Sequence, residues 1–504
     1  MKKVFCAITL IMLYGICMAK PKIISSAPCE YRNVSCDFFG YEKWFKEEIS
    51  YRQAMEDLDT LIYLLKNAYS GYEDAVKRGL ETDRITESFK KSFSEGQNIK
   101  ASDLSQFLYD FLNPYIQDFH FFIESKDFGK NLITVHRILY SNIYVRKVCD
   151  NYIIEKSDDN DFRTGETLFL KSENLFLYPS EGEKIFRVGS YATFDEKEKQ
   201  IPVNCRNNER LLSCNIENNY VWSSDITSYK EIETKDSLYI YIPTLQDIHT
   251  NDNRKAKLDE NFKKLHSVSE RYPQKKNIIL DLRTNHGGNS LHTSKFLANL
   301  YFAEKNCTEK NTINHIKKTL KIFNDFDFRI DLISPPIVQA ENCIAKYVFF
   351  EDKLWIEEFN KRRNFLNNQN LRITYSENKK IKPKSANPKF NGKLVILSGK
   401  NTCSSGELAI VEAKKLFPKT NQIIQLGENT AGCFAYGNVW CYQLPNSGIA
   451  MHLPSFVWKF EECPEGFGLK PDYWSTNEDI LNSLVQLTGD TELTERLADI
   501  NSNL

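Results

Sequence analysis

The chain of 504 residues has no excess of charge of either sign. It contains 66 basic and 67 acidic residues, which gives a formal net charge of −1. A nearly neutral chain produces no long-range field that would attract nucleic acid or an anionic membrane. We therefore expect no nucleic acid among its partners.

Long hydrophobic runs are also scarce. The marked apolar run, residues 4–18, follows Lys2 and Lys3 and precedes Ala19, which is the pattern of a secretory signal peptide. The run is short for a membrane-spanning helix. The sequence predicts a signal peptide at 1–19, no stable membrane insertion and a mature protein that is secreted or periplasmic.

Motifs for metal binding are missing. None of the 13 cysteines belongs to a CxxC motif, and no Cys/His cluster has the spacing of a zinc site. We expect no metal and no cofactor. In an oxidising compartment most of the 11 cysteines outside the signal should pair. Cys29–Cys36 and Cys205–Cys214 are the candidate close pairs, and the odd count leaves one cysteine over.

The hydrophobic patterns predict several domains of an α/β protein. Apolar residues with helical spacing, such as Leu58, Leu61 and Leu65, indicate an N-terminal helical domain at 20–125. Short runs of strand-forming residues indicate a β-rich domain at 126–235. Buried strands then alternate with helices over 236–480, which predicts a mostly parallel sheet. A long insertion near 300–390 and a helical tail at 481–504 complete the predicted chain.

Two segments at the ends of predicted strands have the residues of a nucleophilic site. Asp281–Gly288 ends in paired glycines, whose backbone N–H groups could form an oxyanion hole. The alternative is a plain strand-to-helix turn. Asn401–Glu407 opens a helix with Ser404, where the helix N-terminus favours an oxyanion. The alternative there is a capping box of Ser404 with Glu407. Neither segment contains the GxSxG nucleophile motif.

Two further segments are weak signals by themselves. Gln117–His120 contains a histidine just past the predicted N-terminal helices, and a lone histidine is more often structural than catalytic. Glu465–Asp472 alone is typical of a glycine-rich turn.

Taken together, the four segments resemble the C-terminal-processing (tail-specific) and tricorn protease family. That family has D-x-R-x-N-x-G-G, then S-x-x-E, then G-E-x-T-x-G, then E-G-x-G-x-x-P-D, with D-x-H upstream. The matching segments here are Asp281–Gly288, Ser404–Glu407, Gly427–Gly432, Glu465–Asp472 and Asp118–His120. The resemblance implies a serine peptidase with a crotonase/ClpP-like core, and a degenerate PDZ-like domain at 126–235.

The family register assigns roles to the residues of the first two segments. Ser404, three residues before Glu407, matches the nucleophile, and Ser405 is the alternative nucleophile. The backbone N–H of Ser405, together with that of Gly287 or Gly288, would form the oxyanion hole.

The residue expected to act as general base differs from that of one branch of the family. Members with a Ser–Lys dyad have a lysine just after G-E-x-T-x-G, but Cys433 stands there and no lysine occurs between Thr420 and Trp458. The tricorn-like branch uses an upstream histidine held by a carboxylate, which implies His120 as base and Glu465 as orienting acid. The rival base is His286, and the rivals of Glu465 are Glu461 and Glu462.

The family implies protein or peptide substrates and leaves the oligomeric state open. Two other functions fit the same fold. One is a catalytically inactive protein that binds a ligand or peptide, because a fold alone does not fix a function. The other is an esterase that uses the same serine.

Overall fold

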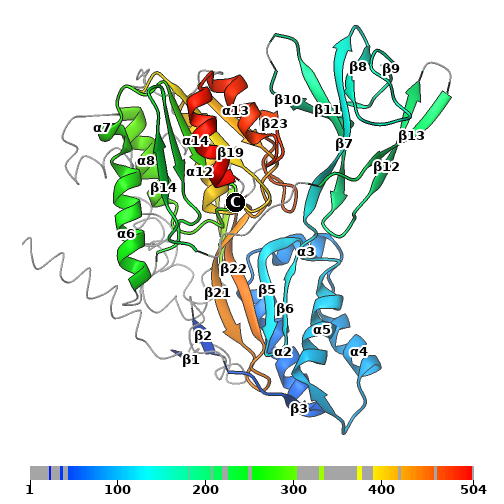
Figure 1. Cartoon of the computed structure of the whole chain (residues 1–504). Coiled ribbons are helices and arrows are strands. Elements are labelled where there is room, and N and C mark those ends of the chain that lie inside the picture. Colours follow the sequence, from blue (N-terminus) through cyan, green and yellow to red (C-terminus); the bar gives the residue numbers. More distant parts are fainter. Residues whose placement is uncertain are drawn as a thin grey trace, which may run out of the picture. The chain divides into compact units, whose positions relative to one another are not determined.

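The chain divides into two compact units in the computed structural model (Figure 1). The first unit consists of residues 1–133, 326–378 and 435–461, and the second of 134–325, 379–434 and 462–504. Each is described by itself. The structure describes residues 22–23, 35–37, 44–180, 182–205, 208–217, 225–247, 253–302, 329–333, 372–376, 390–417, 422–458 and 463–501. The predicted signal peptide, 1–19, lies outside them.

The described part of the first unit contains four helices: α2 (Tyr51–Asn67), α3 (Tyr72–Lys77), α4 (Asp83–Ser92) and α5 (Ala101–Leu112). Helix α2 begins at a capping box, in which Gln53 N–H donates to Ser50 Oγ and Ser50 N–H donates to Gln53 Oε1. The apolar stripe of α2 is buried in the core, as its spacing predicts.

The helices pack against an antiparallel sheet built from distant parts of the sequence. Strand β5 (Asp118–Ser125) pairs with β6 (Phe128–Leu132) and with β22 (Ala450–Trp458), and β22 pairs with β21 (Tyr436–Gln443). Short strands extend the sheet: β1 (Lys22–Ile23), β2 (Ser35–Asp37), β17 (Arg329–Ile333) and β18 (Arg372–Ser376). Strands β3 (Glu48–Ser50) and β4 (Asn98–Lys100) pair separately.

A β-rich part opens the second unit. It contains the sheet β10-β11-β7-β8-β9 and the hairpin β12-β13. The strands are β7 (His136–Val148), β8 (Asn151–Ser157), β9 (Thr167–Leu168), β10 (Leu175–Tyr178), β11 (Ile185–Thr193), β12 (Lys199–Cys205) and β13 (Asn208–Cys214). A short 3-10 turn, Ser172–Asn174, precedes β10.

The hairpin corrects one predicted disulfide. Cys205 pairs with Asn208 at the turn, whereas Cys214 pairs with Lys199 at the open end. Six residues of extended strand separate the two positions by roughly 20 Å, and both cysteines are free. The predicted Cys205–Cys214 disulfide is therefore wrong. The two cysteines are close in sequence, but the register of the hairpin places them at its opposite ends. Cys29 of the other predicted pair lies outside the described residues.

The second sheet of this unit has the order β14-β15-β16-β19-β20-β23 and is parallel from β15 to β23. Its strands are β14 (Lys230–Glu233), β15 (Ser237–Tyr241), β16 (Asn277–Asp281), β19 (Lys393–Ser398), β20 (Ile423–Gly427) and β23 (Tyr473–Trp474). Strands β15, β16 and β20 are buried throughout, which explains their continuous apolar sequences.

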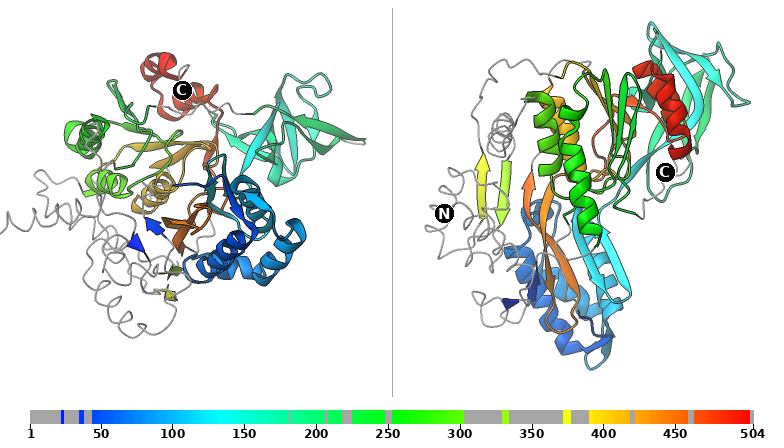
Figure 2. Two further views of the ribbon diagram at one scale, coloured as in Figure 1. Left: turned by 90° about the horizontal axis from the view of Figure 1, so that it is seen from below. Right: turned by 60° about the vertical axis from the view of Figure 1, so that its left-hand side comes forward.

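Helices cover both faces of this parallel sheet (Figure 2). Alternate strand residues such as Tyr239, Val395 and Leu426 pack against α13 (Ile480–Thr488) and α14 (Thr491–Asn501). On the other side, α8 (Leu291–Phe302) contacts α6 (Asn253–His266), α7 (Val268–Arg271) and α12 (Ser405–Leu416). The fold is thus mixed α/β with several sheets, as predicted.

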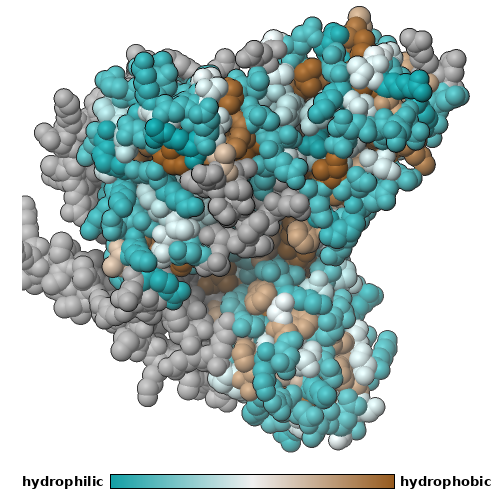
Figure 3. Space-filling view, viewed as in Figure 1, coloured by the Kyte–Doolittle hydropathy of each residue, from teal (hydrophilic) through white to brown (hydrophobic). Residues whose placement is uncertain are grey.

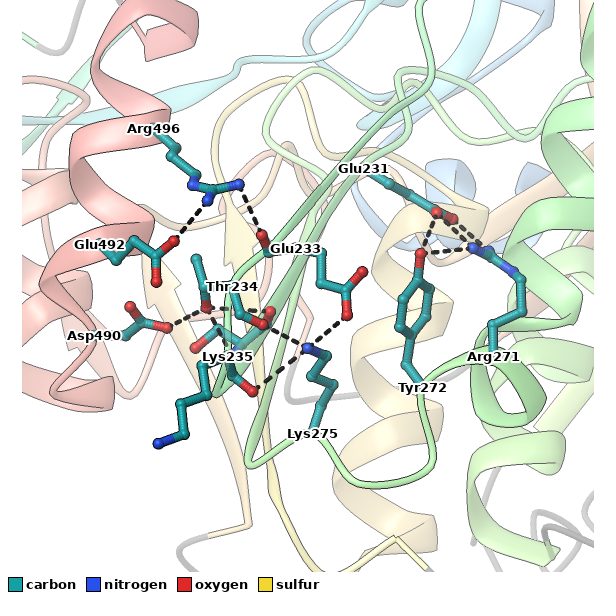
Figure 4. Close-up of polar contacts among 11 residues, drawn as sticks. Glu231, Glu233, Thr234, Lys235, Arg271, Tyr272, Lys275, Asp490, Glu492 and Arg496 are labelled. Carbon is teal, nitrogen blue, oxygen red and sulfur yellow. Dashed lines mark hydrogen bonds and ion pairs between the residues drawn. The ribbon is translucent and has the colours of Figure 1, made fainter.

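Edge strand β14 is covered by polar contacts rather than by another strand (Figure 4). Arg271 donates to both carboxylate oxygens of Glu231, at 2.7 and 2.6 Å. Lys275 pairs with Glu233, whose backbone carbonyl accepts from Arg496 of α14. Charged side chains at a sheet edge discourage pairing with another chain. None of the described helices is long and apolar enough to cross a membrane.

Candidate active site

Ser404 lies between β19 and α12 in a strained backbone conformation. Its φ is +50° and its ψ is −114°, and it is the N-cap residue of α12. Among the described residues, Cys149 is the other non-glycine residue with a positive φ. Such a conformation costs roughly 1–3 kcal/mol and persists where the surroundings enforce it, often at functional sites.

The carboxylate of Glu407 enforces this turn. Its Oε2 accepts from the backbone N–H of Ser404 and of Cys433, both at 2.9 Å. Its Oε1 accepts from Gly432 N–H at 2.9 Å and from the Thr430 hydroxyl. Burial raises the pKa of Glu407, while these hydrogen bonds act to lower it. The glutamate of S-x-x-E therefore joins the serine turn to the segment 430–433.

The glycine turn lies directly against the serine turn. A Cβ on Gly287 would come within 2.9 Å of Ser404 Cβ and 3.1 Å of Ser405 N, so only glycine fits there, at φ +85°. Ser405 Oγ donates to the carbonyl of Gly288 at 2.6 Å. The structure thus brings together the predicted residues Ser404, Ser405, Gly287 and Gly288.

The two glycines differ in what their N–H groups can do. Gly287 N–H already donates to Asn285 Oδ1 at 2.8 Å. Gly288 is exposed and follows it at the turn. The N–H of Gly287 thus already has an acceptor within the turn, a contact that the sequence could not predict.

Buried polar contacts hold the glycine turn in place. Arg283 pairs with Asp281 at 2.7 Å, and Tyr239 donates to the same carboxylate at 2.6 Å. Asn285 Nδ2 donates to the carbonyl of Ile242 at 2.9 Å. The Asp, Arg and Asn of the motif D-x-R-x-N therefore fix the backbone after β16.

The loop of Glu465 docks on the segment that Glu407 holds. Gly466 N–H donates to Gly432 O at 2.8 Å, and Thr430 N–H donates to Leu469 O at 3.1 Å. Burial raises the pKa of the Cys433 thiol well above its usual range, and the charge of half-buried Glu465 contributes. Glu465 thus lies near residues 430–433, the segment that Glu407 connects to Ser404. Its rivals Glu461 and Glu462 lie outside the described residues.

His120 belongs to the first unit, on β5. Asp118 accepts from the backbone N–H of His120 at 2.8 Å and of Phe121 at 3.2 Å, which explains the acid in D-x-H. Burial raises the pKa of Asp118 to about 7 and lowers that of His120 to about 4. His120 is therefore neutral at pH 7, as a general base must be.

His286, the rival base, belongs to the second unit. It is half-buried and directly precedes the glycine turn. Burial lowers its pKa as well, so both candidate histidines are neutral at pH 7, the state in which a general base must start.

Sequence reasoning missed the buried residues around the serine turn. Lys400, only 7% exposed, lies with its Nζ 3.4 Å from Thr430 O, and burial lowers its pKa to about 8. The Cys463 thiol donates to Glu407 Oε1 at 3.5 Å. A lysine just after a buried strand and before the serine was the available signal.

Residues 236–474 match the family model described as Peptidase family S41. This range includes Ser404, both glycines and Glu465, and it excludes His120. No curated protein matches the chain in sequence.

Similar solved structures include three proteases. Mature CPAF is 15% identical with a TM-score of 0.45, over 90% of this chain and 98% of its own. The photosystem II D1 C-terminal processing protease is 12% identical with a TM-score of 0.32, over 85% and 93%. The tricorn protease is 15% identical with a TM-score of 0.36, over 90% and 37%.

Proposed function

Because residues 236–474 match peptidase family S41, the chain is a serine-type peptidase, and we propose that it is a secreted endopeptidase with Ser404 as its nucleophile. The family implies protein or peptide substrates. The proposal adds the catalytic residues, the acyl-enzyme mechanism and the secreted or periplasmic location.

The strained turn at Ser404 is the observation that carries the proposal. A serine at φ +50° needs support, and buried Glu407 supplies it by accepting the Ser404 N–H. The neighbouring Ser405 hydroxyl is engaged with the Gly288 carbonyl, which argues against Ser405 as nucleophile.

In the proposed reaction, Ser404 Oγ attacks the carbonyl carbon of the substrate while its proton passes to His120. The carbonyl oxygen becomes an oxyanion, which the N–H groups of Ser405 and of Gly288 or Gly287 stabilise. The carbon–nitrogen bond then breaks, and the leaving amine takes the proton from His120. Water attacks the acyl-enzyme by the same route and releases the carboxylic acid and free Ser404.

We assign Glu465 as the acid that orients the base. Its carboxylate would accept from the imidazole and fix its tautomer, and the positive charge that forms on the ring would be stabilised. His286 is the alternative base, because it adjoins the glycine turn in sequence. A base that is neutral at pH 7 is required in either case, and both histidines meet that requirement.

We also propose finer features of the fold. The parallel sheet with its helices would be a crotonase/ClpP-like core. The β-rich part would be a degenerate PDZ-like domain.

Labelling with a fluorophosphonate probe tests the catalytic assignment. We expect labelling of the wild type and of Ser405→Ala, and none of Ser404→Ala. His120→Ala should lose labelling while His286→Ala keeps it, and the reverse result would make His286 the base. Labelling of Ser404→Ala would overturn the nucleophile.

Two outcomes would favour the other functions. An unlabelled wild type would favour a catalytically inactive binding protein. A labelled wild type that hydrolyses p-nitrophenyl esters but leaves unfolded casein intact would favour an esterase.

A further inference from the structure

Three aromatic rings gather at the loop that carries Glu465. Phe467 stacks on His136, with ring centroids 3.8 Å apart and planes 12° apart. Tyr191 meets Phe467 edge-on at 5.9 Å. We call His136, Tyr191 and Phe467 the aromatic cluster. All three belong to the second unit.

Phe467 is exposed although its ring is large and apolar. Exposed large hydrophobic side chains of the described second unit are Phe169, Phe194, Leu211 and Phe467, and 37% of Phe467 is accessible. Figure 3 shows a mainly hydrophilic surface over the β-rich part, with isolated hydrophobic residues. Of these four, Phe467 alone lies on a loop of the candidate active site.

The packing behind the cluster holds Phe467 in place. Gly466 O accepts from His136 N–H at 2.8 Å, and Phe467 O accepts from the Asn429 side chain. Tyr191 packs in turn against Phe176 at 6.0 Å. A preorganised aromatic ring loses little conformational entropy when a ligand covers it.

Contacts within the second unit connect the cluster to the nucleophile. A Cβ on Gly432 would come within 2.7 Å of Phe467 N, and Gly432 N–H shares the Glu407 carboxylate with Ser404 N–H. The loop of Phe467 is thus connected to the serine turn through Gly432 and Glu407.

The chemistry of the cluster selects for apolar groups. Burial, followed by the positive charge of Lys400, lowers the pKa of His136, so its ring is uncharged at pH 7. Lys470 lies over the Tyr191 ring, 5.7 Å from its centroid. Glu465 on the same loop and Glu428 near Tyr191 offset the charge of the two lysines, whereas exposed aromatic faces favour an apolar or aromatic group.

We propose that the aromatic cluster is a specificity subsite, in which Phe467 binds an apolar or aromatic side chain of the peptide substrate. The inference rests on the proposed function, because it needs cleavage at Ser404. It adds the class of side chain that the enzyme selects.

Internally quenched peptides that differ in one residue beside the cleaved bond test this subsite. We expect the wild type to have a higher kcat/KM with Phe or Leu than with Ala or Lys. In Phe467→Ala the ratio of kcat/KM for Phe over Ala peptides should fall roughly tenfold. Phe467→Leu should retain most of the ratio.

Phe169→Ala is the matched control, because it removes another exposed aromatic ring of the same unit, 45% accessible. It should leave the ratio unchanged. An unchanged ratio in Phe467→Ala, an equal loss in Phe169→Ala, or a wild type that does not prefer Phe or Leu would overturn the subsite. Fluorophosphonate labelling of the wild type distinguishes these failures from a failure of the proposed function.

Discussion

At the scale of single residues, Gly287 shows why the paired glycines of the motif are needed. Gly287 and Gly165 both have φ +85°, but a Cβ on Gly165 would meet nothing within 4 Å. Comparing substitutions at the two positions therefore distinguishes the cost of a left-handed backbone from the cost of the close approach to Ser404.

Gly287→Ala should lower the rate of probe labelling at least tenfold, because its Cβ would displace Ser404 or Cys403. Gly165→Ala should keep the labelling rate and lose only the backbone term, about 1–2 kcal/mol of unfolding free energy. Labelling kinetics and thermal melts of both variants check this. Equal labelling of the two variants would contradict the close approach.

Glu412 is a buried acid that the proposed mechanism does not use. The Ser294 hydroxyl lies 2.8 Å from each of its carboxylate oxygens. Burial raises the pKa of Glu412 from 4.5 to about 8. The folded chain therefore keeps a proton that the unfolded chain releases, and this contribution to stability is lost as pH rises from about 4.5 to 8.

Glu412→Gln should remove this loss, since glutamine stays neutral. We expect the melting temperature of the variant to exceed that of the wild type by a few degrees at pH 8, and to differ little at pH 5. Melts of both proteins across this range give the comparison. A difference that does not grow with pH would refute a protonated Glu412.

At the scale of elements, the pair Arg271–Glu231 stabilises the edge strand β14. Burial acts to raise the pKa of Glu231, but hydrogen bonds from Arg271 and Tyr229 outweigh it, and the pKa is lowered. The contribution of this carboxylate to stability is therefore present above its unfolded pKa and is lost as pH falls through the folded value.

Arg271→Met should reduce the unfolding free energy by about 1 kcal/mol at pH 7, because the pair is bidentate but partly exposed. The reduction should shrink at acidic pH, once pH falls through the lowered pKa of Glu231 and this carboxylate becomes protonated. Arg52→Met is the control, since Arg52 pairs with Glu56 on α2 and is 90% exposed. Urea unfolding at both pH values measures the effect, and an equal loss in the control would contradict it.

The elements also show what the sequence could predict. Continuous apolar segments predicted the parallel strands β16, β19 and β20, and the motifs predicted which turns follow them. Periodicity could not place β21 and β22, because pairing with β5 depends on contacts more than 300 residues apart. The occupied N–H of Gly287 and the buried Lys400 depend on side-chain contacts, which no spacing encodes.

At the scale of the whole molecule, the first unit is assembled from separate segments of the chain. Its core contains residues of α2 and α5 together with Tyr442, Met451 and Leu453 of β21 and β22. A fragment that ends at residue 133 lacks these partners and exposes the edge of β5.

We expect the fragment 44–133 to lack a cooperative melt and to be cleaved rapidly by added protease. The full chain carrying Ser404→Ala is the reference, so that self-cleavage does not interfere. A fragment that melts cooperatively would show that the hairpin β21–β22 is dispensable for this core.

This discontinuous assembly has a consequence for biosynthesis. At 5–20 residues per second, a ribosome needs roughly 15–60 s to pass from β6 to β22. Throughout that time the core around α2 and α5 lacks the residues that β21 and β22 supply. The strand of His120, β5, therefore gains its β22 partner only after residues 401–407, which contain Ser404, have been translated.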